Sequence, residues 1–543
     1  MNVVGEQAGR SRRGALRGGA RSVAPACVAL YLAAVLALLL AILHRDDGVF
    51  TYTLDDPYIH LALAANLAHG HYGINPGEAS SPSSSIVWPF LLVPSAGSAW
   101  GMFLPLAWNV LFCGIAAWLL GRIVDGWAGQ TRANMRAQDN VAKWRWMGKL
   151  VVAVGLMLVA NLAGLTFVGM EHGLQVLLAI TCAAGMMEAF AGRRMPAWCL
   201  WAAVLGPIVR YENFALMAAV AIALYGQGRG RAAARVVALS VVGPALFSIF
   251  LVSRGLPALP TSVLVKARAY SQQGNAAIAI LRSQYLALHT RMTIPEWWAQ
   301  AAVGVILIVL AMLAKQRVRR FVLLGATLAA GLQLALGQFD WFHRYEVYAI
   351  VFTALVAAQA LVSMRLHWRY LAIALFAIAC PYELALWDTP AAAANIYQQQ
   401  YQMHRFVADF YRGNVAVNDL GWVSYRRPAG VYVLDLWGLA SPEASRQERK
   451  DAAWLDAIVR EHGAGLAIIY PDWYDEGAPD DWQPLATMCI RSPFTSISRP
   501  CVVFYSTPVG DAGLLTAEMA AFARTLPAGV KMTLGKDSTD DDE

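Results

Sequence analysis

Charged side chains are scarce in this sequence, since Asp, Glu, Lys and Arg make up only 15% of its 543 residues while 58% are hydrophobic. So low a charge content excludes a soluble enzyme, a nucleic-acid-binding protein and a secreted disulfide scaffold. About 20 apolar residues in a helix cross a bilayer core of about 30 Å, and apolar runs recur from near Val28 to near Trp387. Because a helix satisfies its own backbone hydrogen bonds in lipid, the sequence predicts a polytopic α-helical membrane protein.

Patterns that would indicate other chemistry are also missing. The sequence has no glycine-rich phosphate loop, no Cys/His spacing typical of a metal site, no internal repeat and no visible interruption of its apolar segments. Four of the seven cysteines fall inside apolar segments, where a thiol behaves as a small hydrophobic group. Cys489 and Cys501 bracket a predicted hairpin in an oxidising compartment, where a disulfide and two free thiols stay open as alternatives.

The basic residues predict the orientation of the chain, because short loops rich in Lys and Arg stay cytoplasmic. Residues 1–25 form a basic cytoplasmic N-terminus, and no small-residue cleavage site follows the first apolar segment, which predicts a retained helix. With every basic loop inside, about eleven spans result: residues 26–44, 101–122, 149–168, 173–192, 196–209, 212–226, 234–253, 297–315, 320–337, 345–364 and 369–387. The short pair within residues 196–226 forms either two spans or a re-entrant hairpin.

An odd number of spans that begins inside places the chain after the last span outside. The sequence therefore predicts a membrane domain at residues 26–387 and an outer, periplasmic domain at residues 388–543. An outer loop at residues 44–100 carries two surface elements, which begin at Asp56 and Ser83. In the tail, a helical stretch at 445–462 separates two of four β-branched runs, at residues 415–419, 431–435, 466–470 and 501–505. This alternation is typical of a small α/β domain.

Asp55 and Asp56 are adjacent carboxylates at the predicted outer membrane surface, in TLDDPYIH. One interpretation is structural, because Asp is a good N-cap for the helix that follows. The other is functional, because ionisable residues at membrane depth are costly and usually have a role. A carboxylate held ionised near a helix N-terminus is suited to act as a base.

Further charged residues fall in the turns predicted to face the same compartment. They are Glu171 and His172 in GMEHGL, Arg210 and Glu212 in RYEN, Lys266 in LPTSVLVKA, and His343 and Arg344 in HRYEVY. Each alone is more often a structural ion pair or a cap. Together they predict one site with a carboxylate base and several cations able to bind a phosphate.

These ordered motifs, with DDPYI, NLAHGHYGINPGE and SSPSSSIVWP before them, resemble the GT-C superfamily of polytopic glycosyltransferases. The closest resemblance is to bacterial and mycobacterial arabinofuranosyltransferase-like proteins, and it covers the whole membrane part. Two positions depart from the family pattern: Tyr211 follows Arg210 where proline is commoner, and His172 replaces a frequent threonine. The resemblance therefore does not identify the sugar or the acceptor of this protein.

The resemblance implies a GT-C-like fold and a transferase that uses a polyprenyl-phosphate-linked sugar at the outer face of the bacterial inner membrane. The acceptor is then an envelope glycan, lipid or protein, and neither nucleic acid nor a cofactor is expected. A divalent cation is allowed but not indicated. Because the lipid phosphate leaves already charged, one carboxylate base suffices for an inverting displacement.

We expect Asp55 to be the base, with Asp56 in support. Donor-phosphate binding is expected from Lys266, Arg344, Arg210 and His343, and substrate binding from Glu171, His172, Glu212 and Tyr58. The alternatives are a transporter or flippase of lipid-linked sugar, and a noncatalytic envelope-assembly protein. Transporters commonly carry inverted repeats and interrupted helices, and the sequence suggests neither.

Overall fold

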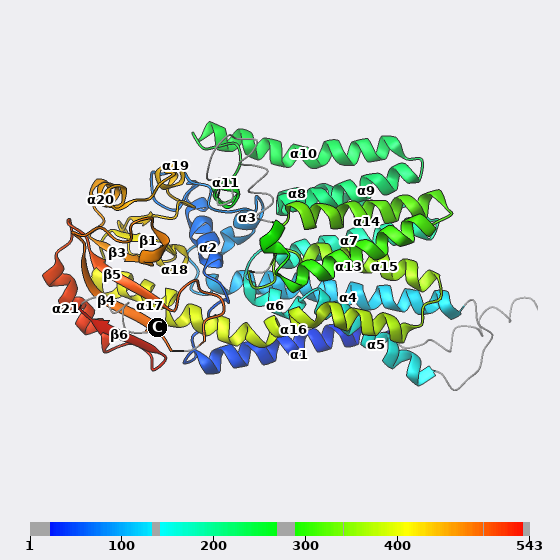
Figure 1. Ribbon diagram of the computed structural model, residues 1–543, viewed down its shortest axis with the longest axis horizontal. Helices are drawn as coiled ribbons and strands as arrows, with labels where there is room; N and C mark the ends of the chain where they lie inside the picture. The colour runs from blue at the N-terminus through cyan, green and yellow to red at the C-terminus, as the bar shows by residue number, and fades with distance from the viewer. Residues whose placement is uncertain (1–21, 133–141, 269–287, 340, 492, 536–543) are drawn as a thin grey trace, which may run out of the picture.

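The computed structural model describes residues 22–132, 142–268, 288–339, 341–491 and 493–535. A helical bundle forms one end of the molecule and a sheet domain forms the other (Figure 1). Helix α2 (Asp56–Leu67) lies between them, and its neighbour α3 (Trp88–Leu92) continues into a short 3-10 turn. The helix predicted to begin at Asp56 is present, but its first two turns are buried and not spread along a surface. The stretch after Ser83 is only partly helical.

The bundle consists of apolar helices that match the predicted segments. Their bounds are α1 (Ala24–Arg45), α4 (Leu104–Arg132), α5 (Ala142–Val159), α6 (Leu162–Val168), α7 (His172–Phe190), α8 (Ala197–Val209), α9 (Phe214–Gly226), α10 (Gly230–Ser253), α13 (Pro295–Leu313), α14 (Arg317–Leu336), α15 (Val347–Ser363) and α16 (Trp368–Gln398). Among the described residues, eight helices are long and apolar enough to cross a membrane, and three shorter apolar helices, α8, α9 and α15, fall at the remaining predicted segments. The protein is therefore a polytopic helical membrane protein with about eight candidate spans.

Two features of the bundle differ from the prediction. Helix α16 does not end near Trp387 but continues to Gln398, followed directly by α17 (Gln400–Arg405) and one π-helical turn (Phe406–Tyr411). The chain also breaks between α5 and α6, where Asn161 has a left-handed backbone with φ of 44°. The expectation of uninterrupted apolar segments was wrong, because Asn reaches this conformation more easily than most residues.

The C-terminal domain is built on a six-stranded sheet in the order β2-β1-β3-β5-β4-β6. The strands are β1 (Val415–Val417), β2 (Val433–Asp435), β3 (Leu466–Ile469), β4 (Gln483–Ile490), β5 (Cys501–Ser506) and β6 (Val530–Leu534). Strands β2, β1 and β3 run parallel to one another, whereas the pairs β3–β5, β5–β4 and β4–β6 are antiparallel. The predicted α/β domain and its four predicted strands are confirmed, while β4 and β6 were not predicted.

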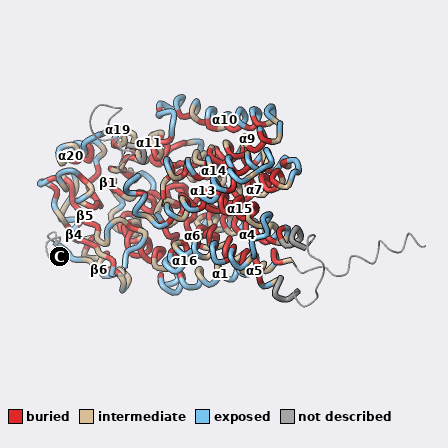
Figure 2. Tube along the Cα trace, turned by 45° about the vertical axis from the view of Figure 1, so that its right-hand side comes forward, coloured by how far each residue is buried: buried red, intermediate tan, exposed pale blue. Residues whose placement is uncertain are grey.

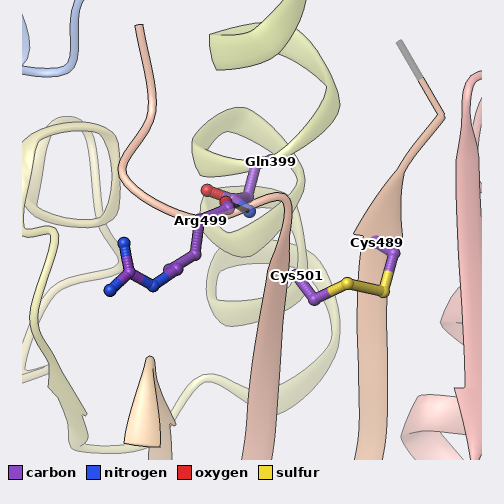
Figure 3. Close-up of a disulfide and its surroundings, with 4 residues drawn as sticks. All are labelled: Gln399, Cys489, Arg499 and Cys501. Atoms are coloured by element: carbon purple, nitrogen blue, oxygen red, sulfur yellow. Dashed lines mark hydrogen bonds between the residues drawn. A yellow bond between two sulfur atoms is a disulfide. The ribbon is translucent and has the colours of Figure 1, made fainter. Parts of the chain in front are cut away.

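Helices α18 (Gly421–Ser424), α19 (Pro442–Arg446), α20 (Ala452–Glu461) and α21 (Ala512–Ala523) complete this domain. The predicted single helical stretch at 445–462 is therefore two helices. A disulfide joins Cys489 of β4 to Cys501, directly opposite in β5 (Figure 3). Beside it, the Gln399 side chain donates a hydrogen bond to the backbone carbonyl of Arg499 at 2.9 Å, which ties the start of β5 to the end of α16.

The loop between α1 and α4 connects the sheet domain to the bundle through hydrogen bonds. Asn75 donates its side-chain amide to the carbonyl of Val433 at 2.9 Å and accepts the Val433 N–H at 3.1 Å. These bonds satisfy the free edge of β2, which is an outer strand of the sheet. Arg427 also donates to the carbonyl of Ile74. One hydrophobic core includes residues of both parts, and buried residues continue from the bundle into the sheet domain (Figure 2).

Candidate functional site

Four separate segments bring their charged residues together at the end of the bundle that lies under the sheet domain. They are the start of α2, the turn between α6 and α7, the turn between α8 and α9, and the residues just before α15. The ion pairs described below join these segments. Five of the predicted site residues, Asp56, Glu171, Arg210, Glu212 and Arg344, therefore belong to one network, as the shared compartment predicted.

Arg210 is buried and lies between two carboxylates. Its guanidinium donates to Glu171 at 2.7 Å and to Glu212 at 2.7 Å, and it lies 3.4 Å from the hydroxyl of Ser84. The Glu171 side chain is fully buried, whereas that of Glu212 is 35% exposed. Ser84 comes from the SSPSSS stretch of the outer loop, so this motif also reaches the network.

Arg344 is the second buried cation. It donates to Asp56 at 3.2 Å and to the hydroxyl of Tyr345 at 2.8 Å. The ring of Tyr345 separates the two cations, with the guanidinium carbon of Arg344 at 4.8 Å and that of Arg210 at 5.4 Å from its centre. The Asp56 side chain is 29% exposed, which leaves this carboxylate accessible to a ligand.

Asp55 has a different environment from Asp56. Its two carboxylate oxygens accept the backbone N–H groups of Gly421 at 2.7 Å and Trp422 at 2.9 Å, at the N-terminus of α18. The approach is so close that a Cβ atom on Gly421 would lie 2.1 Å from the Asp55 carbonyl oxygen. The Asp55 side chain does not cap α2. It instead caps a helix of the C-terminal domain, 366 residues further along the chain.

The pKa values of Asp55 and of its neighbour Asp419 are both raised above their ordinary range. Burial and the nearby carboxylate of Asp419 raise the pKa of Asp55, and the two N–H bonds oppose this shift. Asp419 follows β1 and was not predicted as a site residue. Burial likewise raises its pKa, with a contribution from Asp56. The outer domain therefore adds an acid beside the predicted pair.

The remaining predicted residues lie outside this network or support it. His343 pairs with Glu296 at 2.7 Å, at the start of α13. His172 is buried with its ring edge-on to Tyr345. Tyr58 is buried, stacks on Trp422 at 4.0 Å and accepts the Tyr52 N–H, which is a packing role. Lys266 belongs to α11 (Thr261–Arg268), but its side chain lies outside the described residues.

His60 is a further residue that the motifs did not single out. Burial lowers its pKa, although Glu171 and Asp56 lie near enough to oppose this. Its Nδ1 atom and the Oε2 atom of Glu171 are buried without a hydrogen-bond partner within the described part of the chain. His60 stands four residues after Asp56 in α2, and this helical spacing was the signal that could have identified it. The described residues contain no group of three His, Cys, Asp or Glu able to hold a metal ion.

The architecture defines the class of the molecule as a multi-pass helical membrane protein. Residues 394–505 match the model of a protein family described as a domain of unknown function, DUF8728. The matched segment is about a fifth of the chain and runs from the end of α16 to β5. The protein is thus a multi-pass membrane protein with a C-terminal DUF8728 domain. No curated protein and no solved structure matches the chain significantly.

Proposed function

We propose that the protein is a membrane glycosyltransferase that moves a sugar from a polyprenyl-phosphate donor to a cell-envelope acceptor. The observation that carries the proposal is the network of Asp56, Arg344, Arg210 and Glu171, assembled from four segments beneath the outer domain. A buried charge network of this size is costly unless it has a purpose. Because Asp56 remains partly exposed, a substrate can reach it.

In this reaction Asp56 is the general base. Its carboxylate takes the proton of an acceptor hydroxyl, and the hydroxyl oxygen attacks the anomeric carbon of the sugar. The bond from that carbon to the phosphate oxygen breaks, and polyprenyl phosphate leaves with its electron pair. Asp56 is a better candidate than Asp55, because both oxygens of Asp55 already accept backbone N–H groups. The proposed role of Asp55 is to position the outer domain.

Arg344 is the proposed partner of the donor phosphate. Its pair with Asp56 is longer than the other ion pairs of the network, at 3.2 Å. A phosphate that binds Arg344 competes with Asp56 for the same donor groups and thereby releases the carboxylate to act as a base. Arg210 is held by two carboxylates, which suits it to shape the site rather than to bind the phosphate. Lys266 remains the proposed second phosphate ligand.

The proposed setting is the outer face of the bacterial inner membrane, with eleven spans, a cytoplasmic N-terminus and a periplasmic DUF8728 domain. In this proposal the shorter apolar helices α8, α9 and α15 supply the three spans beyond the eight long candidates. The disulfide supports an oxidising compartment for the outer domain.

One observation favours a transporter or flippase of lipid-linked sugar as the second candidate. The break between α5 and α6 borders an apolar cavity of about 170 Å³, lined by Asn161, Tyr31 and Tyr382 among others. Interrupted helices are common at transporter sites. The cavity lies away from the charge network, since none of the network residues lines it.

The test is a deletion strain analysed for lipid-linked sugars and envelope glycans. A transferase predicts that the lipid-linked sugar accumulates on the outer leaflet while one glycan linkage disappears. Reintroducing the gene should restore the linkage, and reintroducing Asp56→Asn should not. Accumulation on the inner leaflet alone would support the transporter instead.

A further inference from the structure

Asp419 lies where the outer domain meets the paired acids of the first loop. It follows β1, at the carboxyl end of the parallel part of the sheet. In open α/β sheets this edge is the usual place for functional side chains. Its own hydrogen bonds allow its protonation state to be deduced.

The argument begins with the hydroxyl of Tyr470. This oxygen lies 2.5 Å from Oε1 of Gln399 and 3.0 Å from Oδ2 of Asp419. A hydroxyl has one hydrogen and can donate only once. If both neighbours were pure acceptors, one of the two contacts would bring two lone pairs together.

The orientation of the Gln399 amide is fixed independently. Its Nε2 atom donates to the backbone carbonyl of Arg499 at 2.9 Å, so Oε1 must face Tyr470 (Figure 3 shows Gln399 beside Arg499). Gln400 Nε2 also donates to this oxygen at 3.0 Å. The shorter contact of Tyr470 is therefore its donated bond, and the contact with Asp419 needs its proton from the carboxyl group.

We propose that Asp419 is a neutral carboxylic acid that donates to Tyr470, and that it is a positioning residue for the site beneath it. Oδ2 of Asp419 then donates to Tyr470 and accepts from Gln400 Nε2 at 2.9 Å, while Tyr470 donates to Gln399. Gln400 Nε2 also lies 3.4 Å from the Tyr470 hydroxyl, which has a lone pair left to accept from it. The inference rests on the proposed function only in its consequence for catalysis. The proposed protonation state is argued from the hydrogen bonds and involves no sugar donor.

The charges that face Asp419 explain why neutrality matters. The titratable groups around it are Asp55 and Asp56 from the first outer loop and α2, Asp435 from β2, and Tyr470 and Tyr474 from the segment after β3. Burial raises the pKa of Asp419, and the charges of Asp56 and Asp435 add to this shift, whereas the hydrogen bonds with Gln400 and Tyr470 oppose it. Burial and the charge of Asp419 also raise the pKa of Asp55, to about 8, although its two N–H bonds favour the charged form. An ionised Asp419 would place another negative charge beside Asp55 and repel α18 from it.

The sign of the pH dependence follows. Here docking means the contact of the sheet domain, through α18, with Asp55 of the first loop. In the docked state Asp419 holds a proton that the solvated carboxylate of an undocked domain would release. Docking therefore weakens as pH rises through the pKa that Asp419 has in the docked state. The bonds from Gly421 and Trp422 to Asp55 report on docking directly. They can be followed by hydrogen exchange of these amides without any substrate.

The experiment measures amide exchange of a peptide covering 420–425 in the full-length protein in lipid nanodiscs, from pH 7 to 10. After correction for intrinsic rates, the wild-type protein should lose protection at least about tenfold at the alkaline end. Asp419→Asn stays neutral at every pH and should keep its protection throughout. Asp472→Asn, which changes an exposed acid paired with Arg499, is the matched control and should behave as wild type.

Tyr470→Phe decides the direction of the bond. If Asp419 donates to Tyr470, removing that acceptor destabilises the neutral acid, and the loss of protection moves to lower pH. If instead Tyr470 donates to an ionised Asp419, the same variant raises the pKa and the loss moves to higher pH, which overturns the proposal. Flat wild-type protection, or loss of protection in Asp419→Asn at pH 7, would overturn it as well. The exchange experiment uses no sugar donor, so it is independent of the glycosyltransferase proposal. If that proposal alone fails, the exchange will behave as described but the protein will show no transfer activity.

Discussion

Asn75 pairs with both the carbonyl and the N–H of Val433, so one side chain replaces a strand partner at the edge of the outer sheet. Asn75→Asp keeps the acceptor but replaces the donor with an oxygen that faces the Val433 carbonyl. We expect the free energy of unfolding to fall by about 1 to 3 kcal/mol, measured by thermal unfolding in detergent. Asn75→Ser has a smaller side chain that can still donate, so its free energy of unfolding should fall by less. If the two variants lose the same amount, the size of the Asn75 side chain and not its hydrogen bonding holds the loop in place.

Arg210→Met should destabilise the bundle by about 3 to 5 kcal/mol, because it leaves the buried Glu171 carboxylate without its cation. The matched control is Arg193→Met, since Arg193 pairs with Glu188 at the surface and both side chains are well exposed. That change should cost no more than about 1 kcal/mol. Adding Glu171→Gln to Arg210→Met should recover part of the loss, and no recovery would show that Glu171 is not what makes Arg210 necessary.

Asp56→Asn should lower sugar transfer by at least about 10², because Asn cannot take a proton, and it should also lower the melting temperature, because it removes the carboxylate partner of the buried Arg344. Asp55→Asn should lower stability as well, since an amide nitrogen cannot accept the second N–H bond at α18, but it should keep most of its transfer per folded protein. Activity and melting temperature measured side by side separate the two roles. Full transfer by Asp56→Asn with loss in Asp55→Asn would return the base to Asp55.

Gly421→Ala should detach α18 from the first loop, because the added Cβ would lie 2.1 Å from the Asp55 carbonyl oxygen. We expect a large loss of stability and of amide protection at 420–425. Gly331→Ala in α14 is the matched control, because nothing lies within 4 Å of its Cβ position. In a helix that change should be neutral or slightly stabilising. Similar behaviour of the two variants would argue against the tight contact.

The sequence predicted most of the bundle because apolar length and loop charge are both local signals. It did not predict the continuation of α16 through DTPAAAANIYQ, because Asp388 and Pro390 in this stretch favour the end of a helix and not its middle. Strand β4 was missed because QPLATMCI has few β-branched residues, and β6 because VKMTL lies at the edge of the sheet and is largely exposed. The break at Asn161 has neither glycine nor proline to mark it.

The candidate site was predictable in outline and not in detail. A shared compartment was enough to group Asp56, Arg210 and Arg344 before their contacts were known. The environment of Asp55 was not predictable, because its partners Gly421 and Trp422 belong to a distant domain whose placement depends on tertiary packing. For the same reason, nothing near Asp419 in the sequence pointed to Asp55.

Helix α16 has a mechanical consequence. Its 31 residues extend about 46 Å at about 1.5 Å per residue, whereas a bilayer core is about 30 Å thick. The final turns, which contain Pro390, are thus a helical lever joined to the C-terminal domain without a loop. A thinner or thicker bilayer changes the tilt of such a helix, and the far end of the lever moves with it. Lipid chain length thereby becomes a means of shifting the sheet domain over the bundle, and vesicles of graded acyl length would reveal that coupling.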